Sequence, residues 1–475
     1  MADSFIKRHE IKLLLVCMTL LGLAAGWLFF SRPGHRIETD FMTREQQRQP
    51  DPWLAGQARS NTVAEERARA CLALGRIGGN GGSARLIESL SDPAASVRAF
   101  AAFGLGLIGD RDWMQGREPN AEAARALGRV LQDENRRVVT YAVEALGKMR
   151  WQRLARAIAD TPAPLAVTLA ALVRMDDARF ADLMTNATRS DDQDIRWAAT
   201  VALEELQAPV TEDMTKAYLR LAKDRNDFVR AAVARGLSRL DPQDDVFNAL
   251  RILSKDRDSK VRFEAVRSIG RLANAEHTAA LEEAVSDENP LIRAEAERSI
   301  RALVEDVADS LPPRDPSPTT APLDEEPLRF DFAELPDISR TIGRRLILET
   351  ALGEFEIALD YDNAPLAAER FYRLATSGAY DGAVFGQVRP NGYLQAAPAK
   401  PMGPLIPEFN TQPFLRGSMG MVRAGPDSDS AEFFIAATPL LFADTRYTNF
   451  GRLISGDAIL DRITPGTRIT TIREP

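Results

Sequence analysis

Between about residue 61 and residue 305 the chain repeats one short pattern, and this repetition constrains its fold more than any other feature. A period of about 30 residues is the signature of a solenoid, in which each unit packs only against its neighbours. Examples are "SDPAASVRAFAAFGLG" from Ser91, "DRNDFVRAAVARGLSRL" from Asp224 and "DRDSKVRFEAVRSIGRL" from Asp256. Asp or Ser caps a helix start, and the Ala, Val and Leu that follow at helical spacing form one buried face. We therefore predict an all-α solenoid.

Charged residues recur at fixed places in these units. The pattern resembles HEAT repeats of the short kind, of which about seven copies would fill the region. The Trp, Gly and Tyr spacing that tetratricopeptide repeats require is missing. We interpret the recurring charges as helix caps and as a ladder of ion pairs between stacked helices, and a charged groove for a partner protein is the alternative. They are Asp92, Arg98, Arg196, Asp224, Arg230, Asp256, Arg262 and Arg293.

The N-terminus carries a basic tail and then an uncharged run. Lys7, Arg8 and Lys12 precede "LLLVCMTLLGLAAGWLFF" at residues 13–30. About 18 apolar residues just span the hydrocarbon core of a membrane. The small residues at 24–26 would also suit a cleaved signal peptide, but the apolar run continues beyond them. We predict an uncleaved single-pass membrane anchor, with most of the chain outside the cytoplasm, in the periplasm.

The overall charge and the scarce His and Cys residues exclude several functions. The formal net charge is −8, so the chain offers no general basic surface and we expect no nucleic-acid partner. His9, His35 and His277 are scattered along the chain, and Cys17 and Cys71 form no metal-ligand spacing. We expect no metal and no cofactor.

A proline-rich stretch divides the chain. After Asp309 it reads "SLPPRDPSPTTAPLDEEPLRFDF", which is typical of an extended, semi-rigid spacer. The predicted organisation is a basic tail at 1–12, an anchor at 13–30, a juxtamembrane segment at 31–60, the solenoid at 61–305, the linker at 306–340 and a second folded domain at 341–475.

Beyond the linker the hydrophobic period changes from helical to alternating. "RRLILETALGEFEIALD" reads as two strands around a turn at 351–353, and "APLAAERFYRLATSGAYDG" then carries apolar residues at helical spacing. About 130 residues of strands with one or two helices fit a closed barrel with flanking helices.

Three blocks of this region resemble one family in order and in spacing. They are "TALGEFEIALDYDNAPLAAERFYRLATSGAYDGAVFGQV", "RGSMGMVRAGPDSDSAEFFIA" and "RYTNFGRLISG". They resemble the opening, central and closing stretches of cyclophilin-type peptidyl-prolyl isomerases. The resemblance implies a mainly-β closed barrel, so the whole chain is expected to be a multidomain protein with an anchor, a HEAT-like solenoid and a cyclophilin-like barrel.

The chemistry that the resemblance implies is rotation about the bond before proline. Amide resonance sets a barrier of about 18–20 kcal/mol, and lowering it requires no cofactor. In the family an Arg donates to the prolyl nitrogen, and "FGQV" places Gln387 at that position. A neutral amide brings no charge, and charge-assisted hydrogen bonds are roughly twice as strong as neutral ones. Gln387 therefore predicts weakened catalysis, unless Arg389 reaches the same face two residues later.

Further site residues are also carried over from the resemblance. Gln395 matches the substrate-binding Gln, and Phe434 matches the floor of the proline pocket. Around them the resemblance places Gly392 and Tyr393 in the ring pocket, Val422 and Ala424 at its rim, Phe442 and Ala443 at its wall, Tyr447 beside it, and Glu432 where a Gln is usual. The structural alternatives are that Phe434 is barrel core and that Gln395 and Tyr447 are polar residues on exposed strands.

These inferences lead to a membrane-anchored isomerase that assists folding or assembly of partner proteins. Its expected partners are proline-containing peptides or proteins and a protein held by the solenoid. The alternative is a non-catalytic peptide-binding module on a HEAT-repeat scaffold. The residue type at Gln387 separates the two.

Overall fold

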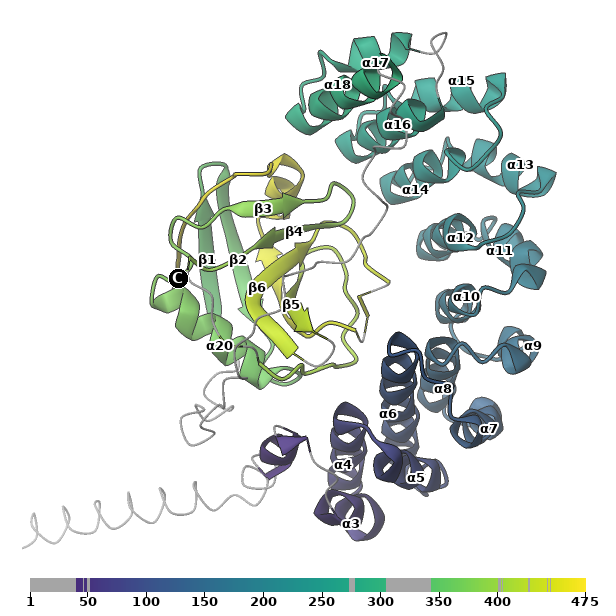
Figure 1. Cartoon of the computed structure of the whole chain (residues 1–475), viewed down its shortest axis with the longest axis vertical. Coiled ribbons are helices and arrows are strands. Elements are labelled where there is room, and N and C mark those ends of the chain that lie inside the picture. The colour runs from purple at the N-terminus through teal and green to yellow at the C-terminus, as the bar shows by residue number, and fades with distance from the viewer. Residues whose placement is uncertain are drawn as a thin grey trace, which may run out of the picture.

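The structure is a computed structural model in which a curved row of helices partly surrounds a β-barrel (Figure 1). It describes residues 40–45, 47–48, 52–272, 278–304, 343–399, 403, 405–425, 428–441, 443–444 and 446–475. The predicted order, a helical solenoid followed by a nearly closed barrel, is confirmed.

The solenoid is built from helical hairpins whose inner and outer helices alternate along the chain (Figure 1). Its helices are α3 (Pro52–Ser60), α4 (Ala64–Ile77), α5 (Asn80–Ser89), α6 (Ala95–Met114), α7 (Ala121–Arg129), α8 (Arg136–Lys148), α9 (Ala155–Ala159), α10 (Leu165–Arg174), α11 (Ala181–Ala187), α12 (Gln193–Glu205), α13 (Glu212–Leu221), α14 (Asp227–Leu237), α15 (Asp244–Leu253), α16 (Ser259–Leu272), α17 (Ala279–Ala284) and α18 (Pro290–Val304). The inner row runs from α4 through the even-numbered helices to α18, and each member packs against the next. Helix α3 packs against α4, although it falls in the segment predicted as juxtamembrane. The predicted domain limits stay predictions.

Small residues and side-chain caps explain the close stacking of these helices. Asn120, Asp192 and Asn226 each accept a hydrogen bond from a backbone N–H in the first turn of the helix that follows. Where α4 crosses α6, a Cβ atom added to Gly75 would lie 2.4 Å from the Cα of Gly104. The helices can therefore approach this closely only because both positions lack a side chain.

The predicted ladder of charge pairs is confirmed. Each arginine binds the acidic residue of the next unit, and most also donate to backbone carbonyls of their own turn. The pairs, with their N–O distances, are Arg67–Asp92 at 2.8 Å, Arg98–Asp133 at 2.7 Å, Arg196–Asp224 at 2.7 Å, Arg230–Asp256 at 2.7 Å and Arg262–Asp287 at 2.8 Å. Arg293, at the end of the array, donates instead to the backbone carbonyls of Asp287 and Glu288.

The barrel is one antiparallel sheet in the order β3-β4-β6-β5-β7-β2-β1-β8. Its elements are β1 (Arg345–Thr350), β2 (Gly353–Leu359), α20 (Pro365–Thr376), β3 (Phe385–Val388), β4 (Tyr393–Ala396), β5 (Ser418–Gly425), β6 (Ser428–Ala436), β7 (Asn449–Ser455), η7 (Asp457–Arg462) and β8 (Ile469–Arg473). The edge strands β3 and β8 approach each other through the bridge between Val384 and Arg468. Phe371 of α20 packs on Phe433 and Phe450, so this helix covers the inner aromatic core.

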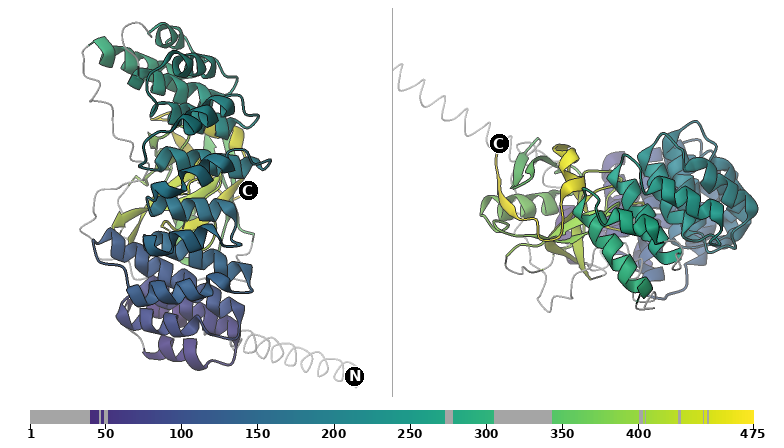
Figure 2. Two further views of the ribbon diagram at one scale, coloured as in Figure 1. Left: turned by 90° about the vertical axis from the view of Figure 1, so that its right-hand side faces the viewer. Right: turned by 90° about the horizontal axis from the view of Figure 1, so that it is seen from above.

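The barrel lies against the concave side of the solenoid, as the three views agree (Figures 1 and 2). Arg446 of the barrel makes a two-point ion pair with Asp110 of α6, at 2.6 and 3.0 Å. Further along the solenoid, Lys260 pairs with Asp461 at 3.2 Å. These contacts join residues that are hundreds of positions apart in the sequence.

The predicted membrane localisation is overturned. Within the described part of the chain, no helix combines the length and the apolar composition that a membrane crossing requires. Helix α6 has 20 residues, but Arg98, Asp110, Arg111 and Asp112 interrupt its apolar surface. The anchor predicted at 13–30 lies outside the described residues.

Candidate functional site

A row of polar side chains crosses the outer face of strands β3, β4 and β6. Gln387 lies opposite Gln395, and Gln395 lies opposite Phe434. Directly opposed residues project to the same face of a sheet. The register shifts between Phe385 and Gln387, which lets Phe385 enter the inner core while Gln387 turns outward. The sheet thus brings together three of the predicted site residues.

Gln387 is exposed in an open hollow of about 620 Å³ that Gln395 and Glu432 also line. Its Oε1 accepts a hydrogen bond from the Tyr393 hydroxyl at 3.4 Å. Gln395 is buried and donates from Nε2 to Glu432 at 2.6 Å. Burial raises the pKa of Glu432, and the bond from Gln395 opposes that rise. The hollow therefore offers amide and carboxyl groups to a peptide backbone.

Arg389 does not line this hollow. It lies in the turn between β3 and β4, which faces the solenoid. The structure therefore does not bring Arg389 together with Gln387, because the strand ends at Val388 and its alternation ends with it.

The residues assigned to the proline pocket are packed against one another. Tyr393, Val422 and Phe434 are fully buried, and Tyr447 is 7% exposed. Tyr447 meets the Phe434 ring edge to face at 5.4 Å between centroids. With Ala443, five of the predicted residues thus belong to one buried apolar cluster, and Phe442 lies outside the described residues.

Phe414 fills this cluster, and the sequence analysis missed it. Its ring stacks on Phe434 with centroids 5.3 Å apart and an interplanar angle of 24°. The resemblance places a substrate prolyl ring on Phe434, and the Phe414 ring packs on this same side chain. The backbone N–H of Phe414 donates to Asp444 at 2.7 Å, and its carbonyl accepts from Leu440 at 2.8 Å. The only signal in the sequence was an aromatic residue in a loop between two blocks of the resemblance.

The loop that carries Phe414 is held by the solenoid. Phe409 packs with Phe103 and Leu107 of α6, and its carbonyl accepts a hydrogen bond from Arg76 Nε at 3.0 Å. Burial raises the pKa of Asp444 to about 7, although the hydrogen bond from Phe414 opposes that rise. The closed aromatic cluster therefore depends on contacts from both parts of the chain.

Metal chemistry finds no support in the described residues. No group of three His, Cys, Asp or Glu side chains among them is arranged to hold a metal ion.

Comparison with known proteins identifies both parts of the chain. A family model described as cyclophilin type peptidyl-prolyl cis-trans isomerase/CLD matches residues 345–473, and a HEAT-repeat model matches 83–166 and 248–312. The peptidyl-prolyl cis-trans isomerase ppi1 of Schizosaccharomyces pombe is 32% identical over 127 residues, which cover 24% of this chain and 82% of that protein. The peptidyl-prolyl cis-trans isomerase-like 1 of Rhizopus delemar is 30% identical over 129 residues, covering 25% and 78%. A cyclophilin structure from Cryptosporidium parvum is 20% identical with a TM-score of 0.27, covering 28% of this chain and 98% of that one.

Proposed function

Since this chain belongs through residues 345–473 to the cyclophilin-type peptidyl-prolyl cis-trans isomerase family, we propose that its barrel isomerises X-Pro bonds in client proteins with weakened catalysis. The HEAT repeats would present the barrel to a partner protein whose folding or assembly it assists.

The observation that carries this proposal is the position of Gln387 in the open hollow beside Gln395 and Glu432. The Tyr393 hydroxyl donates to Gln387 Oε1, which leaves the Nε2 hydrogens free to face a substrate. A donor to the prolyl nitrogen withdraws its lone pair from amide resonance and lowers the barrier to rotation. Gln387 can make this bond, but without the charge that an arginine supplies.

The test is the cis-to-trans rate of a proline-containing peptide with the full chain. We expect slight acceleration by the natural protein and an increase of at least about tenfold for Gln387→Arg, because preorganised donors aimed at the reacting atoms contribute factors of that order or more. Gln132→Arg adds the same charge at an exposed site on the solenoid and should leave the rate unchanged. No increase for Gln387→Arg would contradict the assignment of this position.

A second candidate function is a peptide-binding module that does not catalyse. The observation that favours it is the Phe414 ring stacked on Phe434. A peptide can bind the outer row of Gln387, Gln395 and Glu432 while its proline stays outside the closed cluster.

Phe414→Ala separates the two functions. If the closed cluster limits catalysis, the double variant Phe414→Ala with Gln387→Arg should exceed Gln387→Arg alone in rate. If the barrel is a binding module, calorimetry should detect peptide binding to the natural chain with no acceleration, and Phe414→Ala should tighten that binding. Equal affinity and equal rate in all variants would contradict the role given to Phe414.

A further inference from the structure

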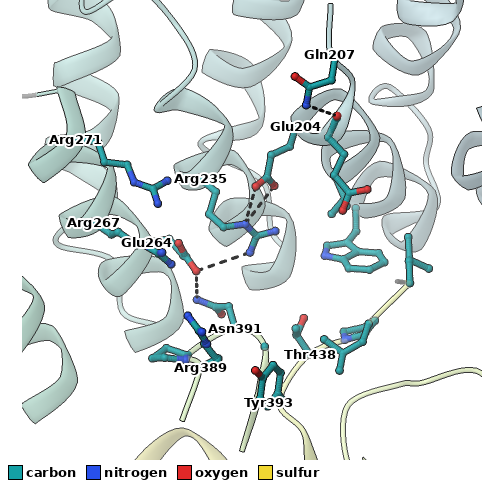
Figure 3. Close-up of a pocket in the computed structure, with 18 residues that line it drawn as sticks. Glu204, Gln207, Arg235, Glu264, Arg267, Arg271, Arg389, Asn391, Tyr393 and Thr438 are labelled. Atoms are coloured by element: carbon teal, nitrogen blue, oxygen red, sulfur yellow. Dashed lines mark hydrogen bonds and ion pairs between the residues drawn. The ribbon is translucent and has the colours of Figure 1, made fainter. Parts of the chain in front are cut away.

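A second pocket lies between the solenoid and the barrel, apart from the open hollow (Figure 3). Helices α12, α14 and α16 form one wall, and the barrel turn at 389–393 with the segment 438–441 forms the other. Its volume is about 420 Å³, which is within the usual range of ligand sites. Tyr393, one of the residues assigned to the proline pocket, also lines this second pocket, so the two sites adjoin each other.

Some charges in this pocket bond to one another. Arg235 donates to both carboxylate oxygens of Glu204, at 3.1 and 3.2 Å. Glu264 is 2% exposed and accepts a hydrogen bond from Asn391 at 3.1 Å. Asn391 also donates to the Lys260 carbonyl and has a left-handed backbone with φ of +58°. These bonds fix the barrel turn against α16.

Three further arginines in the pocket lack such partners. Within the described residues, the guanidinium groups of Arg267, Arg271 and Arg389 make no hydrogen bond and no salt bridge. Arg267 and Arg271 are four residues apart on α16, a spacing at which like charges repel. Burial lowers the pKa of Arg271 and Arg267 lowers it further, whereas the charges of Glu264 and Glu295 oppose this shift. The neighbouring acids Glu264 and Glu295 are already bonded, to Asn391 and Arg298.

Unpaired, half-buried guanidinium groups that line one pocket are arranged for an anion. Four arginines and three glutamates line this pocket, which leaves a formal surplus of one positive charge. One carboxylate matches that surplus, whereas a phosphate dianion would exceed it and face the glutamates. Arginine and carboxylate also pair in a planar, two-point geometry.

We propose that this pocket binds a carboxylate of an acidic peptide, with Arg267 and Arg389 as its principal ligands and Arg271 behind them. Trp197, Tyr393 and Leu440 provide an apolar wall for the adjoining side chains. This inference rests on the proposed function, because it adds an acidic residue near the proline to the segment that the barrel recognises. Each part of the chain supplies one of the two principal arginines, so the site exists only while the barrel is docked.

The test uses calorimetry on the full chain with four blocked hexapeptides. The first contains a proline followed within two residues by a glutamate, and the second has glutamine in place of the glutamate. The third keeps the glutamate but replaces the proline with alanine, and the fourth carries both changes. We expect the glutamate peptide to bind about tenfold more tightly than the glutamine peptide, because a charge-assisted bond replaces a neutral one. Arg267→Gln and Arg389→Gln should each reduce this ratio to nearly one, whereas Arg125→Gln, at an exposed position on α7, should preserve it.

The remaining measurements separate this inference from the proposed function. If the third peptide, with glutamate and no proline, binds more tightly than its copy with glutamine and no proline, the pocket recognises a carboxylate independently of proline. This result would support the carboxylate site even if proline recognition fails. Equal affinity for the glutamate and glutamine peptides, or an unchanged ratio in both arginine variants, would overturn the proposal. Inorganic phosphate that displaced the peptide at equal affinity would overturn the assignment to a carboxylate.

Discussion

The solenoid and the barrel differ in how their polar residues recur along the chain. In the solenoid each ladder arginine meets the acidic residue of the next unit in the same two-point geometry, as in Arg230 with Asp256. In the barrel and at its border, the residues that the proposals single out do not recur along the chain. Gln387, Arg389 and Phe414 each contact a different set of neighbours. Repetition identifies a charge that stabilises the fold. A charge that lacks such a partner among the described residues, such as Arg267 or Arg271, is the better candidate for binding.

The largest expected effect comes from breaking one step of the ladder. Arg230 and Asp256 have side chains only 8% and 12% exposed, and Arg230 Nη1 also donates to the carbonyls of Asp224 and Arg225. Arg230→Ala leaves the Asp256 carboxylate without its partner, which should lower the free energy of unfolding by about 3–5 kcal/mol. Denaturant unfolding followed by far-ultraviolet circular dichroism measures this.

Arg156→Ala is the matched control. It removes an arginine from an ion pair with Asp160 whose side chains are 82% and 59% exposed. Exposed pairs contribute about 0–1 kcal/mol, so the midpoint should barely change. Equal effects of the two variants would contradict the distinction between ladder and surface pairs.

The next largest effect is a pH dependence of the free energy of unfolding, which a buried carboxyl of the barrel should produce. Burial raises the pKa of Glu408 to about 8, although Arg76 and the N–H of Ala367 oppose that rise. The unfolded carboxyl has a pKa of about 4.3, so between about pH 4.3 and pH 8 the folded state binds one proton more than the unfolded state. The contribution of this protonated carboxyl to the free energy of unfolding is fully present below the unfolded pKa and is lost as the pH rises towards 8. Glu408→Gln should therefore remove about 3 kcal/mol of pH dependence between about pH 5 and pH 8.

Thermal unfolding at several pH values measures this contribution. Burial also raises the pKa of Asp429 and of Asp444 to about 7, so some dependence of the same sign should remain in the variant. Glu118→Gln, at an exposed position, should keep the full dependence of the natural chain. A Glu408→Gln variant with that same full dependence would show that this carboxyl is not the source.

The smallest effect concerns the contact between the two regions. Arg446 binds Asp110, which is only 4% exposed. Arg446→Leu leaves Asp110 buried without this partner and should weaken docking of the barrel by about 2 kcal/mol. Small-angle scattering should then report a more extended chain, and hydrogen exchange should rise in the loop at 405–414.

Arg452→Leu is the control for that contact, because Arg452 is an exposed arginine on the same barrel. It should leave the scattering curve and the exchange rates unchanged. Unchanged scattering for Arg446→Leu as well would mean that the remaining contacts, such as Lys260 with Asp461, suffice for docking.

The sequence predicted the solenoid, its ladder and the family of the barrel. It could do so because these features are local or repeated: a cap lies within one turn of its helix, and each ladder arginine meets an acidic residue 25 to 35 positions later, as Arg230 meets Asp256. It also predicted that Gln387 and Gln395 would share a site, which the pairing of β3 with β4 supports. It was wrong about the membrane localisation, and it missed Phe414. The position of Phe414 depends on a loop whose conformation no periodic pattern describes.

The sequence by itself determined the two folds and placed a glutamine, Gln387, at the position that the resemblance assigns to an arginine, because short-range patterns and residue identities specify both. Only the tertiary structure decided that Phe414 covers Phe434 and that Arg267 and Arg389 line one pocket. It also decided that Arg446 meets Asp110, 336 residues away. Such contacts depend on how the barrel docks against the solenoid. That docking is the sum of many small packing and polar terms between distant segments, which have no signature along the chain.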